Sequence, residues 1–457
     1  MISRAETKQG VYASVKSPAG YALFKGIRYG RAERFKAPVF PERFNGVRLA
    51  GSFGPVSPQP PFSPDDETGK PRKWMEGYPY PPEMSEDCLF LNVYTPAETP
   101  EDRLPVLFYI HGGGFQTWYG SCYEYCGDGF CGKGAVVVTI NYRLGVFGFF
   151  AHRDLREESE KNTSGNYGLM DQLLALRWVR ENIARFGGDP DNVTIMGQSA
   201  GAMSVQMLCS NPLAEGLFRH AAMHSGAGLK PIMPDCGMES AERIGEDFLR
   251  YCGAESVEEL RKTPWEVLEE KSLAFGRESG TMFAPVIDGC FFRADPKTCV
   301  REHLMHDVDY LMGSTIDEGY RSDTPVPLFA MMTPNMRAFA KLLITEGYKA
   351  PYLYTFDRPQ PGDDNAGTPH SCDNRYLFRS LAESYRPYDE SDYRLADVME
   401  DYWYSFAKTG DPNGKGRSEW TAFDKGFLQM HLTAGGCAME DFDRDGSLSE
   451  REKAFTD

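Results

Sequence analysis

A serine stands between two glycines near the middle of the chain, in the run V-T-I-M-G-Q-S-A-G that ends at Gly201. The pattern G-x-S-x-G, with an apolar segment before it and a helical segment after it, predicts a sharp strand-to-helix turn that exposes the Ser199 hydroxyl. Side chains at the glycine positions would clash in such a strained turn. Ala200 would begin the helix, so its amide can donate to a developing oxyanion. We therefore interpret Ser199 as the nucleophile of an acyl-transfer reaction.

Three consecutive glycines form a second element with chemical meaning. The run His111-Gly112-Gly113-Gly114-Phe115 directly follows the apolar segment 105–110. Glycines let the backbone approach a substrate closely and direct its amides inward. Gly113 and Gly114 are therefore our candidates to complete an oxyanion hole with Ala200. Each donor of such a hole can supply ~3 kcal/mol or more of transition-state stabilisation.

A serine nucleophile needs a base, and the chain has eight histidines. In hydrolases with this type of turn, the acid and the histidine follow the serine in that order. His370, in G-T-P-H-S-C-D, lies in a loop after the apolar run 352–356 and leads, with His431 as the alternative. The other six are excluded because they precede the serine, lie in an expected buried strand, or precede the acid candidates: His111 and His152, His220 and His224, and His303 and His306.

The acid is expected where the run G-S-T-I-D-E-G follows the apolar segment 309–312. Asp317 and Glu318 both stand at the carboxyl end of this expected strand, where an open α/β sheet collects its functional groups. Spacing alone does not choose between the two. The carboxylate that is not the acid is then a residue that caps the loop.

The elements that must position these residues follow from the apolar pattern after residue 104. The apolar runs are mostly continuous rather than alternating, which is typical of strands buried on both faces of a parallel sheet. They lie at 105–110, 135–141, 193–196, 218–224 and 309–312. Helical segments at 171–186 and 199–209 separate them, so the fold class is α/β. The helical stretch 238–273 breaks the alternation and is expected to be an inserted cap.

Composition limits the remaining possibilities. The chain has 457 residues with a formal net charge of −17, which repels nucleic acids and anionic membranes. Neither a secretory signal nor an apolar run of 18 residues is visible, and 11 cysteines fit reduced thiols, so we expect a cytoplasmic protein. We expect one catalytic domain over 1–457, as a monomer or homodimer, with cap insertions around 235–280 and 320–348. Its expected partner is a small-molecule ester, and no cofactor is expected.

Together these residues resemble the type-B carboxylesterases. The resemblance covers most of the chain, and its motifs occur in the family's order: S-E-D-C-L from Ser85, L-N-V-Y from Leu91, H-G-G-G-F from His111, N-Y-R-L-G from Asn141, G-N-Y-G-L-M-D-Q from Gly165, G-D-P from Gly188, G-Q-S-A-G from Gly197, S-G from Ser225, D-E-G from Asp317 and T-G-D-P-N from Thr409. The resemblance implies an α/β-hydrolase fold, with a mostly parallel central sheet flanked by helices. It also implies that the protein is a serine carboxylesterase, and we expect a bacterial one.

The resemblance also implies roles for particular residues. The triad would be Ser199, Glu318 and His370, and Ser225 would help to hold the acid. The span from Glu318 to His370 is short for the family, so the helical cap is expected to be partly trimmed. Family members with a disulfide at the Cys88 position need an upstream cysteine, which this chain lacks.

Two other functions use the same residues. A non-catalytic binding module on this fold would have a degraded triad, whereas all three members are present here. An amidase or thioesterase would use the same triad, because the machinery attacks any acyl carbonyl.

One further motif lies near residue 441. The run D-F-D-R-D-G-S-L-S-E-R-E matches the loop pattern of an EF-hand, with Asp441, Asp443, Asp445 and Glu452 as candidate calcium ligands. An entering helix should precede such a loop, but Gly435 and Gly436 interrupt the preceding segment. The alternative is an acidic tail without a metal.

Overall fold

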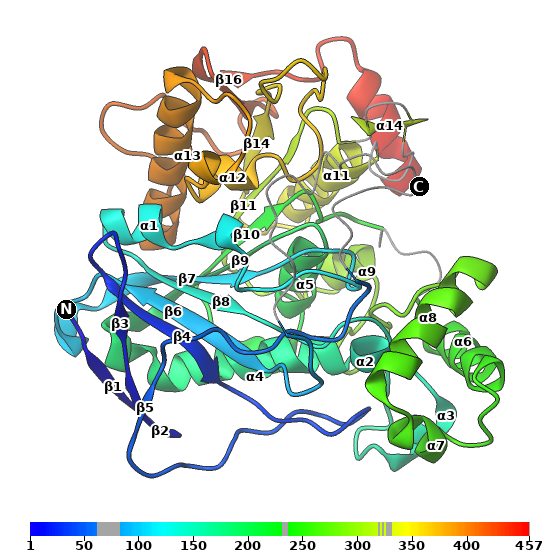
Figure 1. Ribbon diagram of the computed structural model, residues 1–457. Coiled ribbons are helices and arrows are strands. Elements are labelled where there is room, and N and C mark those ends of the chain that lie inside the picture. Colours follow the sequence, from blue (N-terminus) through cyan, green and yellow to red (C-terminus); the bar gives the residue numbers. More distant parts are fainter. Residues whose placement is uncertain (62–82, 231–235, 319, 322–323, 326–330, 457) are drawn as a thin grey trace.

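The computed structural model describes residues 1–61, 83–230, 236–318, 320–321, 324–325 and 331–456. Its main feature is a large twisted sheet (Figure 1). Within the described residues this sheet has 11 strands in the order β16-β15-β14-β11-β10-β9-β7-β8-β6-β4-β3. Their bounds are β3 (Val15–Lys16), β4 (Ala22–Arg28), β6 (Phe90–Thr95), β7 (Leu104–Ile110), β8 (Val136–Ile140), β9 (Gly188–Gln198), β10 (His220–His224), β11 (Asp309–Thr315), β14 (Tyr352–Phe356), β15 (Gln429–Thr433) and β16 (Gly436–Glu440).

The strands from β8 to β15 pair in parallel, and both outer parts of the sheet pair antiparallel. The predicted mostly parallel sheet is therefore confirmed. Two smaller sheets accompany it: β1 (Arg4–Thr7), β2 (Gly10–Ala13) and β5 (Val47–Leu49) form one, and β12 (Tyr320–Arg321) and β13 (Thr324–Pro325) form the other.

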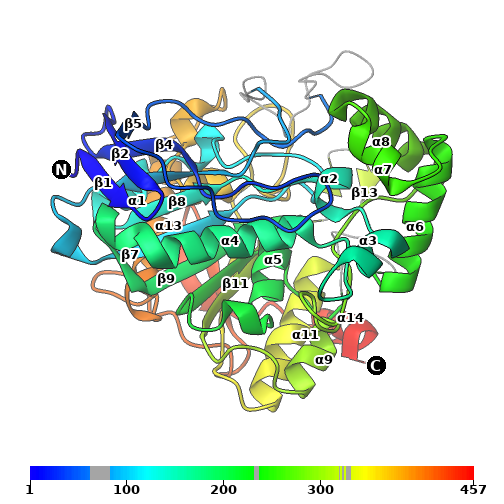
Figure 2. The same cartoon turned by 90° about the horizontal axis from the view of Figure 1, so that it is seen from below.

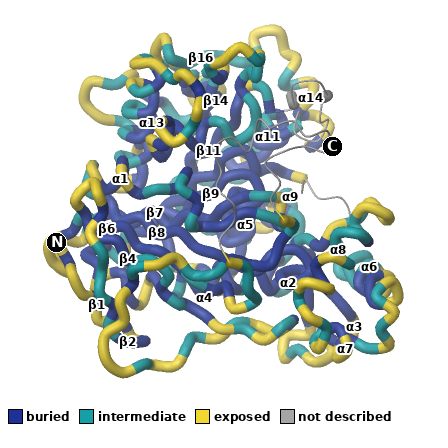
Figure 3. The backbone as a smooth tube through the Cα atoms, in the orientation of Figure 1, coloured by how far each residue is buried: buried dark blue, intermediate teal, exposed yellow. Residues whose placement is uncertain are grey.

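The parallel strands are apolar on both faces because each face is covered. In β7 the side chains of Phe108 and Ile110 join one buried cluster, and those of Leu107 and Tyr109 join the other. All five residues of β8 are buried. Figure 3 shows the same pattern along the backbone, with buried strands inside and exposed loops around them. Continuous apolar runs therefore mark strands that lie between two layers of helices.

The helices form these two layers. One contains α4 (Tyr167–Asn182), α5 (Ala200–Leu208), α9 (Pro296–Arg301) and α11 (Met332–Thr345), and the other contains α1 (Asp128–Lys133), α12 (Asn374–Leu377) and α13 (Glu390–Thr409). Figure 2 shows α4 lying across the strands on its side of the sheet. Local signals set the limits of α13, which begins with a capping box at Asp389 and ends at Gly410 in the left-handed conformation. The C-terminal helix α14 (Ser447–Thr456) packs against α11.

The expected cap over 238–273 is a group of three helices beside the sheet. These are α6 (Met238–Tyr251), α7 (Val257–Lys262) and α8 (Trp265–Ser279), which lie near α2 (Gly145–Phe149) and α3 (Arg153–Glu158) (Figure 1). Phe248, Phe275 and Phe283 pack against one another, and Phe150 joins them from the main domain.

The second expected cap segment, 320–348, lies partly outside the described residues. Its described helix α11 contacts β11 and α14. Because α11 buries residues such as Phe339 and Leu343 against the sheet, it belongs to the covering layer. The cap expected over 320–348 stays a prediction.

Candidate active site

The turn at Ser199 joins β9 directly to α5. Ser199 has φ 56° and ψ −123°, which is a strained conformation for a residue with a side chain. Its backbone amide donates to the His224 carbonyl at 2.8 Å, so the neighbouring strand β10 holds the turn in place. Ala200 is the first residue of α5, and its amide has no partner within the helix. This geometry matches the predicted strand-to-helix turn.

Only glycine fits at position 201, because the neighbouring strand β7 comes very close to the helix there. A Cβ atom at this position would lie 2.0 Å from the Ile110 carbonyl oxygen, which is far inside contact distance. The first turn of α5 thus presses against the end of β7. Since the glycine-rich loop begins at the end of β7, this contact also brings that loop beside the serine.

Gly112 lies against the serine turn. A Cβ at residue 112 would meet the Gln198 carbonyl oxygen at 2.7 Å and the Ser199 Cβ at 3.1 Å. The next two residues, Gly113 and Gly114, have φ values of 92° and 64°, and a Cβ at Gly114 would meet nothing within 4 Å. The loop therefore comes close to Ser199 and turns away into open space at Gly114.

His370 and Glu318 are in direct contact, although they are 52 positions apart. The Nδ1 atom of His370 lies 2.5 Å from Oε2 of Glu318. Glu318 is buried, and its Oε1 accepts a hydrogen bond from the Thr315 amide at 3.0 Å. The other ring nitrogen, Nε2, lies 3.1 Å from Nε2 of Gln198, the residue immediately before Ser199. The imidazole thus extends from the acid to the serine turn.

The surroundings of Glu318 keep it ionised. Burial raises its pKa, but the facing His370, its hydrogen bond with that ring, the Ser225 side chain and the Thr315 amide together hold the pKa below the usual value. Ser225 is buried, and its amide donates to the Gly313 carbonyl at 2.8 Å, which fixes it between β10 and β11.

Asp317, the other acid candidate, has a different partner. Its Oδ2 accepts a hydrogen bond from the Thr368 amide at 2.8 Å. Thr368 lies two residues before His370, so Asp317 anchors the loop that carries the histidine. The structure thus assigns the two consecutive carboxylates to separate contacts, one with the loop backbone and one with the imidazole ring.

The other histidines have structural surroundings. His431, the alternative base, lies in β15 between Asp357 at 2.9 Å and Glu440 at 3.1 Å. Burial lowers the pKa of His111 to about 4, and its ring stacks on Tyr142. His224 is also buried, which lowers its pKa to about 3, and it accepts a hydrogen bond from Trp403 at 2.8 Å. His220 contacts Asp309 at 2.9 Å.

Two residues near the base had no signal in the sequence analysis. Asp373, at the start of α12, is buried and accepts a hydrogen bond from the Tyr354 hydroxyl at 2.8 Å. The pKa of Asp373 is raised to about 6, chiefly by burial; the Tyr354 hydroxyl lowers it and the Glu318 charge raises it within that total. The second is Gln198. Asp373 belongs to no motif, and Gln198 occupies a variable position of G-x-S-x-G, so the contacts of both with distant loops had no signal in the sequence.

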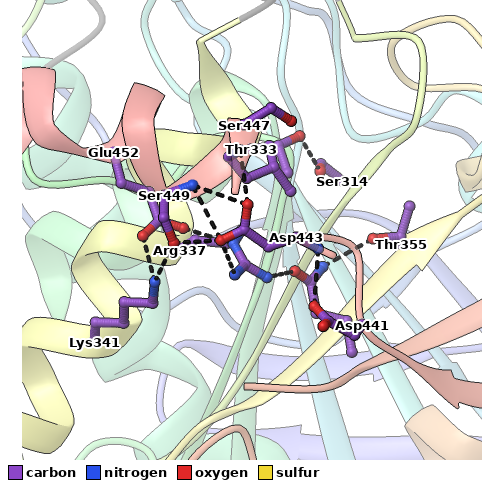
Figure 4. Close-up of polar contacts among 12 residues, drawn as sticks. Ser314, Thr333, Arg337, Lys341, Thr355, Asp441, Asp443, Ser447, Ser449 and Glu452 are labelled. Carbon is purple, nitrogen blue, oxygen red and sulfur yellow. Dashed lines mark hydrogen bonds and ion pairs between the residues drawn. The ribbon is translucent and has the colours of Figure 1, made fainter. Parts of the chain in front are cut away.

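The candidate calcium residues are engaged in other contacts (Figure 4). Glu452 pairs with Arg337 at 2.6 Å and with Lys341, both on α11. Asp443 accepts hydrogen bonds from Leu448 and Ser449 at the start of α14, and Asp445 accepts one from Ser447. In the described part of the chain, no group of three or more His, Cys, Asp or Glu side chains is arranged to hold a metal ion. This arrangement gives the calcium interpretation no support.

Two further findings concern the whole described chain. Cys88, Cys122, Cys131, Cys209 and Cys299 are buried free thiols. None of the helices in the described ranges combines the length and apolar character needed to cross a membrane.

A serine turn, a glycine loop beside it and a paired histidine and glutamate define a hydrolase site, and the family follows from comparison. The model of the carboxylesterase family matches residues 7–325 and 329–449, and the chain belongs to this family. It is a serine carboxylesterase with the α/β-hydrolase fold.

Among individual relatives, the para-nitrobenzyl esterase of Bacillus subtilis (strain 168) is 38% identical, with 97% of each chain covered. Human cocaine esterase is 30% identical, with 91% of this chain and 84% of the relative covered. A solved para-nitrobenzyl esterase structure superposes with a TM-score of 0.86 at 28% identity, covering 99% of both chains. A carboxylesterase of Geobacillus stearothermophilus gives a TM-score of 0.82 at 32% identity, covering 98% of this chain and 99% of the other.

Proposed function

We propose that Ser199, His370 and Glu318 hydrolyse small uncharged carboxylic esters through an acyl-enzyme intermediate. The observation that carries this proposal is the 2.5 Å contact between His370 and Glu318, with the opposite ring nitrogen beside the residue that precedes Ser199. The strained backbone at Ser199 supports the same assignment, because such strain is maintained only where the surrounding structure enforces it.

In this mechanism the Ser199 hydroxyl attacks the ester carbonyl while Nε2 of His370 accepts its proton. Glu318 stabilises the imidazolium through Nδ1. The amides of Gly113, Gly114 and Ala200 donate to the oxyanion of the tetrahedral intermediate. His370 then protonates the leaving alcohol. Water repeats the sequence on the acyl-enzyme, so the acid is released and Ser199 regains its proton.

The preference for an uncharged substrate is part of the proposal, and the apolar residues near α5 are compatible with it. A small cavity of about 30 Å³ borders α5 and the residue after Ser225. Its walls are mainly apolar, with Met203, Met207 and Phe292 among them, but they also include Lys230, and neither Ser199 nor His370 lines the cavity. We expect a p-nitrophenyl ester with a carboxylate on its acyl group to be hydrolysed with a kcat/KM at least about 100-fold below that of the acetate, since a buried unpaired charge costs several kcal/mol. Equal rates on the two esters would contradict this substrate class.

The direct test is Ser199→Ala together with labelling by a fluorophosphonate. We expect the variant to fold, to lose hydrolysis of p-nitrophenyl acetate and to lose the covalent label that the unaltered protein acquires. Substantial hydrolysis by the variant would refute the assignment. A protein that acquires no label at Ser199 would favour the non-catalytic binding module. Amide and thioester substrates measured beside the ester distinguish the amidase and thioesterase alternatives.

We propose the same chain as one catalytic domain over 1–457, with cap insertions around 235–280 and 320–348 and a helical cap that is partly trimmed between Glu318 and His370. The two buried clusters on opposite faces of one sheet support a single domain. Buried free thiols such as Cys88, Cys122 and Cys131 support a reducing compartment. We therefore propose a bacterial cytoplasmic protein that is a monomer or homodimer. Light scattering coupled to size exclusion measures its mass in solution.

A further inference from the structure

The carbonyl oxygen of Gly113 is held by three donors from the residues that follow the glycine loop. The amides of Gln116 and Thr117 each lie 3.0 Å from this oxygen, and the Thr117 hydroxyl lies 3.2 Å from it. Thr117 also packs against the glycine itself, because a Cβ on Gly113 would lie 2.1 Å from the Thr117 carbonyl oxygen. The orientation of the Gly113 carbonyl is therefore set by residues 116 and 117.

Fixing this carbonyl also fixes the amide of Gly114, which belongs to the same peptide group. The peptide bond between Gly113 and Gly114 is trans, and the C=O and N–H bonds of a trans peptide point in opposite directions. The Gly114 N–H therefore points away from Thr117. It donates to no acceptor in the described part of the chain, so it is available to a ligand.

The residues on either side of Thr117 are anchored to other parts of the protein. The Gln116 side chain donates to the Phe283 carbonyl at 2.6 Å, beside the cap helices. Trp118 has φ 89°, and the buried Gln59 side chain accepts from its amide at 2.7 Å and donates to its carbonyl at 3.1 Å. Because such a strained conformation persists only where the surroundings enforce it, the Thr117 hydroxyl is presented from a rigid turn.

We infer that Thr117 is a positioning residue for the oxyanion hole, because its hydroxyl holds the peptide group that carries the Gly114 amide. This role rests on the proposed function, in which that amide donates to the tetrahedral intermediate. The hydroxyl limits rotation of the peptide plane. Its hydrogen bond also polarises the peptide, so the N–H becomes a stronger donor. Since the oxyanion forms only after attack on the ester, both effects lower the barrier without tightening substrate binding.

The test is Thr117→Val, which replaces the hydroxyl by a methyl group of similar size and keeps both backbone donors. Loss of a whole oxyanion-hole donor costs about 10²–10³-fold in kcat, so misalignment of one should lower kcat for p-nitrophenyl acetate by about 5–30-fold. KM should change by less than about twofold, because the ground-state ester does not depend on the hole. Thr117→Ser retains the hydroxyl and should restore kcat to within about threefold of the unaltered protein.

A transition-state analogue separates this role from a general loss of structure. The Ser199 oxygen adds to the carbonyl carbon of phenyl trifluoromethyl ketone, the carbonyl π electrons move onto its oxygen, and His370 takes the serine proton. The hemiketal oxyanion then lies in the hole, so the inhibition constant reports the strength of the donors. In Thr117→Val this constant should rise by about the same factor as kcat/KM falls.

Thr7→Val is the matched control. Thr7 is a buried residue of β1, and its hydroxyl likewise donates to a glycine carbonyl, that of Gly10, at 2.8 Å. Figures 1 and 2 both show β1 apart from α5, so the same chemical change is made away from the serine. Thr7→Val should lower the melting temperature but leave kcat, KM and the inhibition constant unchanged.

A kcat for Thr117→Val within about twofold of the unaltered protein overturns the positioning role. A loss of kcat with an unchanged inhibition constant, or without rescue by Thr117→Ser, overturns it as well. A raised KM at unchanged kcat would place the hydroxyl on the substrate instead. If Thr117→Val does not fold, Thr117→Ala is judged by the same criteria. The proposed function fails separately, when Ser199→Ala retains hydrolysis.

Discussion

Asp317 and Glu318 are neighbours at the end of β11, yet their carboxylates have separate tasks. Asp317 accepts a hydrogen bond from the Thr368 amide at 2.8 Å, and Glu318 meets the His370 ring at 2.5 Å. One carboxylate therefore positions the loop, and the other faces the imidazole ring that the loop carries. Replacing each carboxylate by the corresponding amide should therefore affect hydrolysis very differently at the two positions.

Glu318→Gln should lower kcat by about 10³–10⁴-fold, because a neutral side chain no longer stabilises the imidazolium or fixes its tautomer. Asp317→Asn should lower kcat by less than about tenfold and mainly reduce the melting temperature, since its partner is a backbone amide. Hydrolysis of p-nitrophenyl acetate and thermal unfolding measure the two effects. Equal losses of kcat in the two variants would contradict the assignment of Asp317 to the loop backbone and Glu318 to the imidazole.

Asp373 should make stability depend on pH. Its pKa is raised from 3.8 to about 6, so the folded state binds a proton more tightly than the unfolded chain does. The free energy of unfolding should therefore fall as pH rises from about 4 to about 6. Asp373→Asn removes this dependence, and its stability relative to the unaltered protein should improve between pH 4 and pH 8 by up to about 3 kcal/mol.

Denaturant unfolding at a series of pH values tests this, with Asp389→Asn as a control of opposite sign. Asp389 caps α13, and hydrogen bonds from Ser391 lower its pKa. Its contribution is present above the unfolded pKa and is lost as pH falls through the folded value. The control should therefore be destabilised at neutral pH and lose that difference in acid. A pH-independent effect of Asp373→Asn would contradict the prediction.

The pairing of α14 with α11 should be important for stability. Arg337 is 1% exposed and contacts Glu452, Gln429 and Asp443, so removing the Glu452 charge leaves a buried cation without its main partner (Figure 4). Glu452→Gln should lower the free energy of unfolding by about 3 kcal/mol. Glu450→Gln, on the exposed side of the same helix, should change it by less than about 0.5 kcal/mol.

Calcium should leave the same region unaffected. Since Glu452 is neutralised by two cations and Asp443 accepts hydrogen bonds from backbone amides, we expect equal melting temperatures in millimolar calcium and in chelator. A rise of several degrees with calcium would restore the metal-binding interpretation.

The serine turn should not tolerate a methyl group at Gly201. Gly201→Ala would place Cβ 2.0 Å from the Ile110 carbonyl, so the strand, the helix or both must shift. We expect loss of fluorophosphonate labelling and a markedly lower melting temperature. Gly132→Ala, in α1 with open space around it, should instead stabilise the protein by about 0.5–1 kcal/mol. Normal labelling of the Gly201 variant would disprove the close packing.

Much of this site was predictable because its local signals are strong. The strand before Ser199, the glycines after β7 and the loop around His370 each have a pattern that depends on a few adjacent residues. The choice between Asp317 and Glu318 was not predictable from spacing, because it depends on how a loop 50 residues away folds back. Gln198 and Asp373 were missed for the same reason, since their partners are distant in the chain.

In the fold, too, elements with a local pattern were predictable, and contacts between distant segments were not. The apolar runs located β7, β8 and β14 to within a residue or so, because burial on both faces dictates their composition. The packing of α11 against the sheet was not predictable, because a helix that packs on a sheet and one that packs on other cap helices can have the same apolar periodicity. Its buried partners, β11 and α14, are set by tertiary structure.

The contact between Arg337 and Glu452 spans 115 positions, which has a consequence for protein synthesis. A ribosome that has just released α11 into solution has not yet translated the codons for α14, so the arginine must remain hydrated until that helix emerges. Final closure of this side of the molecule is therefore a late event during translation. A nonsense codon between residues 441 and 447 would release a polypeptide with its site residues all present but with this guanidinium lacking its carboxylate, and such a product should be a preferred target of cellular proteases.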